Sequence, residues 1–148
     1  GGDNIGEFPE RDQTEEKILK FAIKNMFPVL GICRGMQAIN KFFKGDLTTN
    51  KNSDHVAKPH HVNIMNVKFE NLLGDKKFQV NSFHNNLIKN QNLGQGLEIF
   101  ALSDIDDTIE GYFHKEYPII GIMWHPERKQ QTVHQSRLID IFYNKTIW

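Results

Sequence analysis

The stretch VLGICRGMQAINKFFK, residues 29–44, changes from the pattern of a strand to the pattern of a helix within a few residues. Val29–Ile32 is a short apolar run of the kind that forms buried strands, and the apolar spacing over Met36–Lys44 is typical of a helix. Gly45 can end that helix. A tight strand-to-helix turn is therefore predicted around Cys33, the single cysteine of the chain.

Apolar runs and helical patterns alternate along the rest of the chain. A helix is predicted over Asp12–Met26, where Asp12 and Glu15 have the spacing of a capping box, and Thr48–Ser53 is expected to be a loop. Further strands and a last helix follow, and their predicted ranges are His61–Phe69, Phe78–Ser82, Glu98–Ser103, Thr108–Phe113, Ile119–Trp124 and, for the helix, Gln135–Asn144. This alternation predicts an α/β layered fold with a mainly parallel sheet flanked by helices.

The composition favours one globular domain over residues 1–148 without an excess of either charge. Hydrophobic residues make up 39% of the chain, and 18 basic side chains balance 18 acidic ones. This balance gives no general attraction to nucleic acid or to an anionic membrane, so a small molecule or a protein is the expected partner. A lone cysteine forms no internal disulfide, and the sequence has no apolar run of membrane-spanning length, which favours the cytoplasm.

The opening residues, Gly1-Gly2-Asp3-Asn4, have neither the basic nor the apolar region of a signal peptide. Their glycines are typical of a loop that follows a strand. We therefore expect an upstream segment of roughly one or two βα units, given about 30 residues for a βαβ unit.

Cys33 is a candidate nucleophile because of its place on the predicted turn. Gly31 and Gly35 leave room for a sharp bend, as in a nucleophile elbow. The N-terminus of the following helix would favour the thiolate and lower the pKa of the thiol from about 8.5. The alternative is that Cys33 is a small buried apolar residue, which is common for a lone cysteine.

A possible partner for the thiol follows a second strand of similar sequence. The segment PIIGIMWHPE, residues 118–127, resembles PVLGIC, residues 28–33, so it would bring His125 to the same edge of the sheet. Glu127 lies two residues further on, and in an extended segment it points the same way as His125. The pair is typical of a base and its orienting acid, whereas the alternative is a structural histidine and an exposed carboxylate.

These segments resemble the signatures of a known family. GICRGMQ (31–37) and WHPE (124–127) are similar to the two signature segments of class I glutamine amidotransferases. The segments GGDN (1–4), RD (11–12), VNSFHN (80–85) and IEG (109–111) resemble the γ-glutamyl hydrolase branch, the C26 peptidase-like group. The resemblance implies a flavodoxin-like α/β fold and a catalytic triad of Cys33, His125 and Glu127.

The resemblance also implies roles for other residues. The backbone N–H groups of Gly2 and Arg34 would form the oxyanion hole of a thioester mechanism. The residues assigned to the glutamyl moiety are Gln37, Asn81, Ser82, Phe83 and His84. The alternative interpretation makes Gln37 part of a first helical turn and Ser82 a strand end. Many relatives have a histidine and a glutamine after the position of His84, whereas this chain has Asn85 and Asn86.

Three histidines close in sequence, His55, His60 and His61, suggest a metal site, but their spacing matches no familiar ligand pattern. We therefore expect surface or strand histidines, with no metal and no cofactor. Glu110 is expected either to face the pocket or to face solvent from a strand.

The expected reaction is hydrolysis of a γ-glutamyl amide bond with release of glutamate. Within the branch, the segments GICRG, NSFHN, TIE and GIMWH most resemble hydrolases of γ-glutamyl-CDP-amidates from capsule phosphoramidate synthesis, and a γ-glutamyl amine is a second substrate class. Two alternatives remain open. One is a glutaminase subunit that delivers ammonia to a partner synthetase, and the other is a non-catalytic binding protein of the same fold. Homo-oligomers are also compatible with the sequence.

Overall fold

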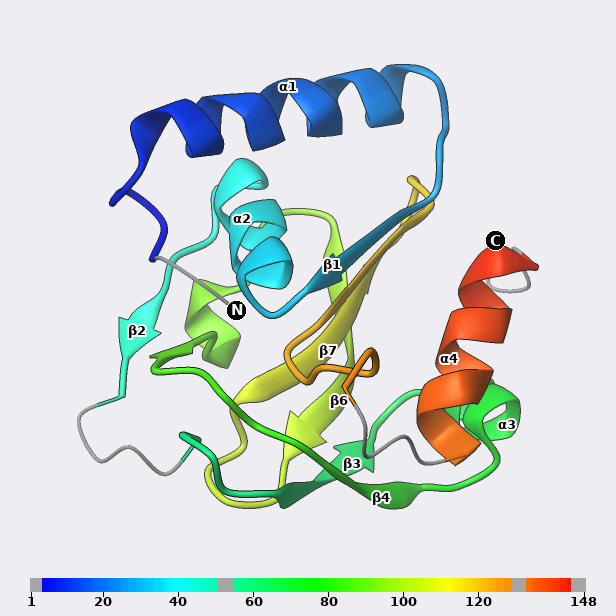
Figure 1. The fold of residues 1–148 in the computed structure, drawn as a ribbon. Helices are drawn as coiled ribbons and strands as arrows, with labels where there is room; N and C mark the ends of the chain where they lie inside the picture. The colour runs from blue at the N-terminus through cyan, green and yellow to red at the C-terminus, as the bar shows by residue number, and fades with distance from the viewer. Residues whose placement is uncertain (1–3, 51–54, 129–132, 145–148) are drawn as a thin grey trace.

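The computed structural model describes residues 4–50, 55–128 and 133–144. Figure 1 shows a central sheet with helices on both faces. The elements in chain order are α1 (Pro9–Lys24), β1 (Val29–Ile32), α2 (Arg34–Phe42), β2 (Thr48–Thr49), β3 (His60–Ile64), α3 (Val67–Leu73), β4 (Lys77–Val80), β5 (Asn86–Leu87), a 3₁₀ turn at Asn90–Asn92, β6 (Leu97–Ser103), β7 (Ile109–His114), β8 (Ile119–Ile122) and α4 (Val133–Tyr143). The α/β layered fold predicted from the sequence is confirmed.

The main sheet is mixed, and the prediction of a mainly parallel sheet is wrong. Its strand order is β1-β8-β7-β6-β3-β4, and only β1 and β8 pair in parallel. The other pairings in this sheet are antiparallel. A five-residue connection, Asp104–Thr108, joins β6 to β7, and a connection that short allows only an antiparallel hairpin. The parallel pair is nevertheless the part of the sheet that leads to Cys33 and His125.

Two apolar cores lie on opposite faces of the sheet. On one face, α1 and α2 pack with Leu19, Met36 and Ile39 against strand residues such as Ile109. On the other face, α3 and α4 cover the sheet, and Leu138 belongs to their core. Figure 1 shows α1 lying across α2 on one side of the sheet and α3 beside α4 on the other. The helical layers thus shield both faces and leave the carboxyl end of β1 to carry chemistry.

Two predicted segments differ from the structure by three residues or more at one end, and Thr48–Thr49 of the predicted 48–53 loop form β2. The helix expected from Asp12 begins at Pro9, because proline suits a first helical position, so Asp12 and Glu15 lie inside α1. The strand expected over His61–Phe69 ends at Ile64, and α3 follows. Asn66 starts α3 because its side chain accepts the N–H groups of Lys68 and Phe69.

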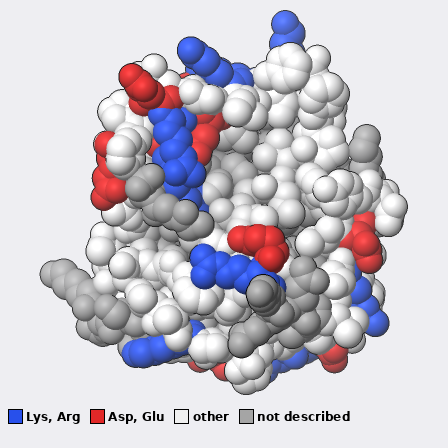
Figure 2. Space-filling view, viewed as in Figure 1, with Lys and Arg blue, Asp and Glu red and all other residues white. Residues whose placement is uncertain are grey.

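The surface agrees with a chain of balanced charge. On the face viewed in Figure 1, Figure 2 shows acidic and basic side chains interspersed, with uncharged side chains between them. None of the helices in the described ranges is both long enough and apolar enough to cross a membrane.

Candidate active site

The parallel strands β1 and β8 bring Cys33 close to the segment that carries His125. Residues 29–32 pair in register with residues 119–122, so Gly31 lies opposite Gly121. The ladder extends one residue further, because the Cys33 N–H donates to the Ile122 carbonyl at 2.8 Å. The prediction that two similar strands lead to one edge of the sheet is confirmed, and His125 follows three residues after Ile122.

Cys33 occupies a strained turn between β1 and α2. Its φ of 51° and ψ of −105° are unusual for a residue with a Cβ, and it immediately precedes the first residue of α2. Gly31 is required for this geometry, since a Cβ there would lie 2.8 Å from the Gly35 carbonyl carbon and would also clash with Ile39. A Cβ on Gly35 would meet nothing within 4 Å, so only one of the two glycines is sterically necessary.

Burial dominates the electrostatics of the thiol. Cys33 is 5% exposed, and this burial raises the pKa of its thiol, although the adjacent Arg34 N–H opposes the shift. The expectation that the helix N-terminus lowers this pKa is therefore wrong, because desolvation of the thiolate outweighs the helix terminus. The resting thiol needs a neighbouring base to become a nucleophile.

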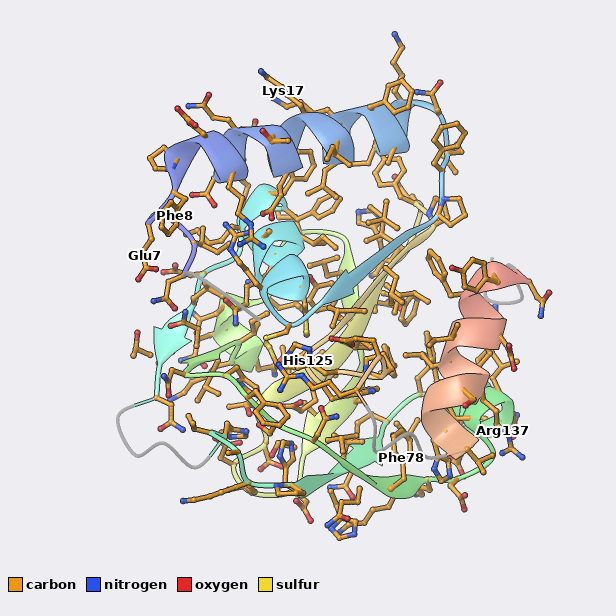
Figure 3. The ribbon with its side chains drawn as sticks, viewed as in Figure 1. Glu7, Phe8, Lys17, Phe78, His125 and Arg137 are labelled. Carbon is orange, nitrogen blue, oxygen red and sulfur yellow. The ribbon has the colours of Figure 1, made fainter. Side chains whose placement is uncertain are left out.

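His125 and Glu127 form a hydrogen-bonded pair. The imidazole Nδ1 lies 2.6 Å from Glu127 Oε1, and the His125 side chain is 1% exposed whereas that of Glu127 is 52% exposed. An ionised carboxylate only accepts, so Nδ1 carries the proton and Nε2 keeps its lone pair. Nε2 is buried and has no hydrogen-bond partner among the described residues. Figure 3 shows His125 near the middle of the molecule, below the turn between β1 and α2.

The segment Asn81–His84 packs around His125. The Asn81 amide hydrogen-bonds the main chain of His125. The Phe83 ring packs edge to face against the His125 imidazole, with the ring centroids 5.9 Å apart. Ser82 Oγ donates to the His55 carbonyl at 2.6 Å. The structure therefore brings Asn81 and Phe83 to the predicted site, whereas the Ser82 hydroxyl is used inside the protein.

The remaining predicted residues lie in three different settings. Gln37 is buried in the first turns of α2, and its Nε2 lies 3.7 Å from the Met123 sulfur. The backbone of Arg34 opens α2 directly after Cys33, as the oxyanion-hole prediction requires, but the Arg34 guanidinium turns to Asp12 and Glu15 of α1. Gly2 lies outside the described residues.

One residue at the site was not predicted from the sequence. The Arg128 guanidinium lies 3.9 Å from the centroid of the Phe83 ring, a cation–π arrangement one residue after Glu127. A basic residue next to Glu127 was the only available signal in the sequence. The contact links the segment after β8 to the segment that carries Asn81.

Asn85 and Asn86, the positions that differ from many relatives, line a polar surface cleft of about 610 Å³. Asn86 Nδ2 donates to Asn4 Oδ1 at 2.8 Å. Neither Cys33 nor His125 lines this cleft. The cleft is therefore separate from the residues expected to react.

A second group of titratable side chains includes His84, at the end of the 81–84 segment. We call His55, His60, His84 and Glu110 the histidine–glutamate cluster, and all four are buried. The interpretation of His55 as a surface histidine and that of Glu110 as a solvent-facing carboxylate are therefore wrong, while His60 and His61 do lie on strand β3 and His61 is exposed. Burial would raise the pKa of Glu110, but His60 and His84 outweigh it and hold this pKa at about 2.

Comparisons with known proteins agree with this geometry. The family model for peptidase C26 matches residues 4–127. The chain is 37% identical over 120 residues to the γ-glutamyl-CDP-amidate hydrolase of Campylobacter jejuni, covering 81% of this chain and 52% of that protein. It is 36% identical over 132 residues to a subunit of the glutamine-hydrolyzing GMP synthase of Methanobrevibacter smithii, covering 88% of this chain and 63% of that one.

Similarity to solved structures supports the fold. A glutamine amidotransferase from Thermotoga maritima superposes with a TM-score of 0.70 at 18% identity, covering 99% of this chain and 61% of that one. The chain spans between about half and two thirds of the length of the curated relatives it matches. The family match over most of the chain, together with the parallel β1–β8 pair that leads to Cys33 and His125, shows that the chain belongs to the peptidase C26 family of class I glutamine amidotransferases.

Proposed function

We propose that this protein hydrolyses a γ-glutamyl amide bond through a Cys33, His125 and Glu127 triad. The observation that carries the proposal is the pairing of β1 with β8, in which a strained cysteine and a hydrogen-bonded histidine–glutamate pair follow adjacent parallel strands. Membership of an enzyme family favours a catalytic role for this arrangement over an inert one.

The first half of the reaction forms a thioester. His125 Nε2 takes the thiol proton, and Cys33 Sγ attacks the γ-carbonyl carbon of the substrate. The resulting oxyanion accepts hydrogen bonds from the N–H groups of Arg34 and Gly2. The carbon–nitrogen bond then breaks, and the imidazolium gives its proton to the leaving nitrogen.

The second half of the reaction returns the enzyme to its resting state. His125 removes a proton from water, and the hydroxide attacks the thioester carbon. The carbon–sulfur bond breaks, glutamate leaves, and the proton returns to the Cys33 sulfur. Glu127 keeps the imidazole oriented and stabilises its charged form during both halves. The raised pKa of Cys33 supports this sequence, because a neutral thiol requires a base before each attack.

The substrate class is proposed from the relative that hydrolyses a γ-glutamyl-CDP-amidate. A γ-glutamyl-CDP-amidate-like compound or a γ-glutamyl amine would present the same glutamyl group to Cys33. Gln37, Asn81, Ser82, Phe83 and His84 would surround the glutamyl moiety or shape its pocket.

A panel of γ-glutamyl compounds tests this function directly. Glutamate release is measured for a nucleotide amidate, several γ-glutamyl amines and glutamine, with Cys33→Ala as the control for contaminating hydrolases. We expect release from at least one γ-glutamyl compound without any added protein. Absence of turnover across the panel, or equal turnover by Cys33→Ala, would contradict the proposal.

A second function is favoured by the relative that belongs to a GMP synthase. In this alternative, the chain is a glutaminase subunit that delivers ammonia to a partner synthetase. Glutamine would then be the preferred substrate, and turnover would increase when the synthetase is added. Size-exclusion chromatography beside the same assay separates the two cases, since an independent hydrolase acts at full rate without a partner.

A further inference from the structure

The histidine–glutamate cluster joins three segments that are far apart in the sequence. His55, His84 and Glu110 bring one nitrogen or oxygen atom each within 4.8 Å of one another, and all three side chains are buried. His60 lies beside these three residues, with its Nε2 at 3.6 Å from Glu110 Oε1. Neither carboxylate oxygen of Glu110 has a hydrogen-bond partner in the described part of the chain. A buried anion with two unpaired oxygens requires a compensating positive charge.

The distances within the cluster are too long for good hydrogen bonds. Glu110 Oε1 lies 3.4 Å from His84 Nε2, 3.6 Å from His60 Nε2 and 3.7 Å from His55 Nδ1. Nitrogen–oxygen hydrogen bonds are usually about 2.7–3.2 Å long. Metal–ligand bonds of about 2.0–2.2 Å in a tetrahedron place neighbouring ligand atoms about 3.3–3.6 Å apart. The separations from Glu110 Oε1 to His84 Nε2 and His55 Nδ1 are therefore close to those between ligand atoms around a shared ion, and longer than those of a hydrogen bond.

In His84 and His55, the ring nitrogen that faces away from Glu110 already has a hydrogen-bond partner. His84 Nδ1 lies 3.1 Å from the Asn86 carbonyl oxygen, and His55 Nε2 lies 3.1 Å from Asp106 Oδ2. A carbonyl oxygen and an ionised carboxylate only accept, so each imidazole donates its proton outward. A bound ion would replace the inward protons that otherwise offset the Glu110 charge, and the lone pairs of His84 Nε2 and His55 Nδ1 would then point toward that ion. Outward donation to a carboxylate or carbonyl is the usual support of metal-binding histidines.

We propose that this cluster binds one divalent transition-metal ion of the zinc class. His55 Nδ1, His84 Nε2 and a Glu110 carboxylate oxygen are the three protein ligands. Two imidazoles and one carboxylate form a donor set that suits Zn²⁺. The proposal does not depend on the reaction assigned to Cys33.

The ion would hold the His125 environment in place. His84 ends the segment that carries Asn81 and Phe83, and the His55 carbonyl accepts a hydrogen bond from Ser82 Oγ at 2.6 Å. The Glu110 carbonyl accepts the Met123 N–H at 2.9 Å, two residues before His125. A metal at the cluster would therefore fasten to the sheet both the 81–84 segment and the segment after β8 that carries His125, which is a structural role.

Metal content and Co²⁺ absorption test the proposal without an activity assay. The purified full chain is loaded with Zn²⁺, dialysed and analysed for bound metal, and a second sample is titrated with Co²⁺, which absorbs visible light strongly in tetrahedral sites. We expect about one Zn²⁺ per chain and a saturable visible band that Zn²⁺ removes. His84→Ala and Glu110→Gln should abolish both signals in samples whose circular dichroism shows a folded chain.

Two further variants keep the test decisive if those substitutions prevent folding. Asp106→Asn removes the carboxylate partner of His55, while the amide oxygen can keep the hydrogen bonds from Thr108, and it should weaken binding about 10–100-fold. His61→Ala is the matched control, because His61 is the exposed neighbour of His60 on β3 and should leave both signals unchanged. Less than a tenth of an equivalent of metal, no visible Co²⁺ band, or loss of binding in His61→Ala alone would overturn the proposal. Imidazole NMR signals showing doubly protonated rings in the presence of Zn²⁺ would also overturn it.

Discussion

Asn81 binds the main chain of His125 with both ends of its amide. Its Nδ2 donates to the His125 carbonyl at 2.9 Å, and its Oδ1 accepts the His125 N–H at 2.8 Å. Both residues are buried. The family resemblance groups Asn81 with contacts to the glutamyl moiety, but both of its polar groups are engaged here. We therefore expect Asn81 to position His125 rather than to touch the substrate.

Replacement of Asn81 by alanine should lower both stability and turnover. The His125 N–H and carbonyl would lose buried partners, at a cost of about 1–3 kcal/mol in the free energy of unfolding. Turnover per folded molecule should fall at least tenfold, while KM changes little. Urea denaturation and steady-state kinetics measure the two effects.

Asn40→Ala is the matched control for that variant. Asn40 is also a buried amide, and it bonds the Asp46 and Asn92 carbonyls and the Gly94 N–H, away from His125. Its loss should destabilise the chain similarly without changing turnover per folded molecule. A purely structural role for Asn81 would make the two variants indistinguishable in kcat.

The triad residues should contribute unequally to turnover. Cys33→Ala and His125→Ala should each nearly abolish glutamate release, and the double variant should be little worse, because residues that act as a unit are strongly non-additive. Glu127→Gln should retain more activity, since the amide oxygen can still accept the Nδ1 proton. Single-turnover kinetics on one γ-glutamyl substrate compares these four variants. Full activity in either alanine variant would overturn the assignment.

The sequence predicted the parts of the site that depend on local pattern. The similar strands ending at Ile32 and Ile122 indicated a shared sheet edge, and the i, i+2 spacing of His125 and Glu127 indicated their contact. The raised pKa of Cys33 was not predictable, because it depends on burial by residues distant in sequence. The histidine–glutamate cluster was missed for a related reason, since its members come from separate segments without a shared spacing.

The difference between local pattern and long-range contacts also explains the errors in the predicted fold. Polar and apolar residues alternate again over residues 66–69, so the strand was predicted to continue to Phe69. The structure instead follows the capping signal of Asn66 and buries Phe69 and Leu73, which lie one helical turn apart in α3. Sheet direction was also beyond local pattern, because a buried strand has the same apolar run in parallel and antiparallel pairs.

Gly31→Ala should destabilise the nucleophile turn, whereas Gly35→Ala should not. The new Cβ at position 31 would meet Ile39 and the Gly35 backbone, so we expect a loss of about 1–3 kcal/mol in the free energy of unfolding. The Cβ at position 35 enters open space within α2, so Gly35→Ala should raise the free energy of unfolding by up to about 1 kcal/mol. Denaturant midpoints of the two variants check this, and an equal loss in both would contradict the steric explanation.

Arg34 should contribute to stability through its side chain. Its guanidinium is 6% exposed and pairs with Asp12 and Glu15, which are about a quarter exposed. Arg34→Met should cost about 2–3 kcal/mol, less than a fully buried pair, because water screens the carboxylates. The control is Arg11→Met, which removes a more exposed pair to Glu15 and should cost less than about 1 kcal/mol. Equal losses in thermal or urea denaturation would contradict this difference.

The pH dependence of kcat/KM should have an acid limb below the usual histidine range. Burial lowers the pKa of His125 from its usual value of about 6.5, and the Glu127 carboxylate opposes that shift without cancelling it. His125 must be neutral to accept the thiol proton, so activity should be present above its pKa and lost as the pH falls through it. A profile that rises only well above pH 6.5 would contradict this assignment.

Glu127→Gln should move that limb to still lower pH, even though it lowers the maximal rate. The carboxylate stabilises the imidazolium, so its removal makes protonation of His125 harder and lowers the pKa further. At the same acidic pH, Glu127→Gln would then keep a larger fraction of its own plateau kcat/KM than the native protein keeps of its plateau value. Comparing the two profiles, each normalised to its plateau, separates this electrostatic role from simple misfolding. A shift of the limb to higher pH would show that Glu127 does not act on His125 through its charge.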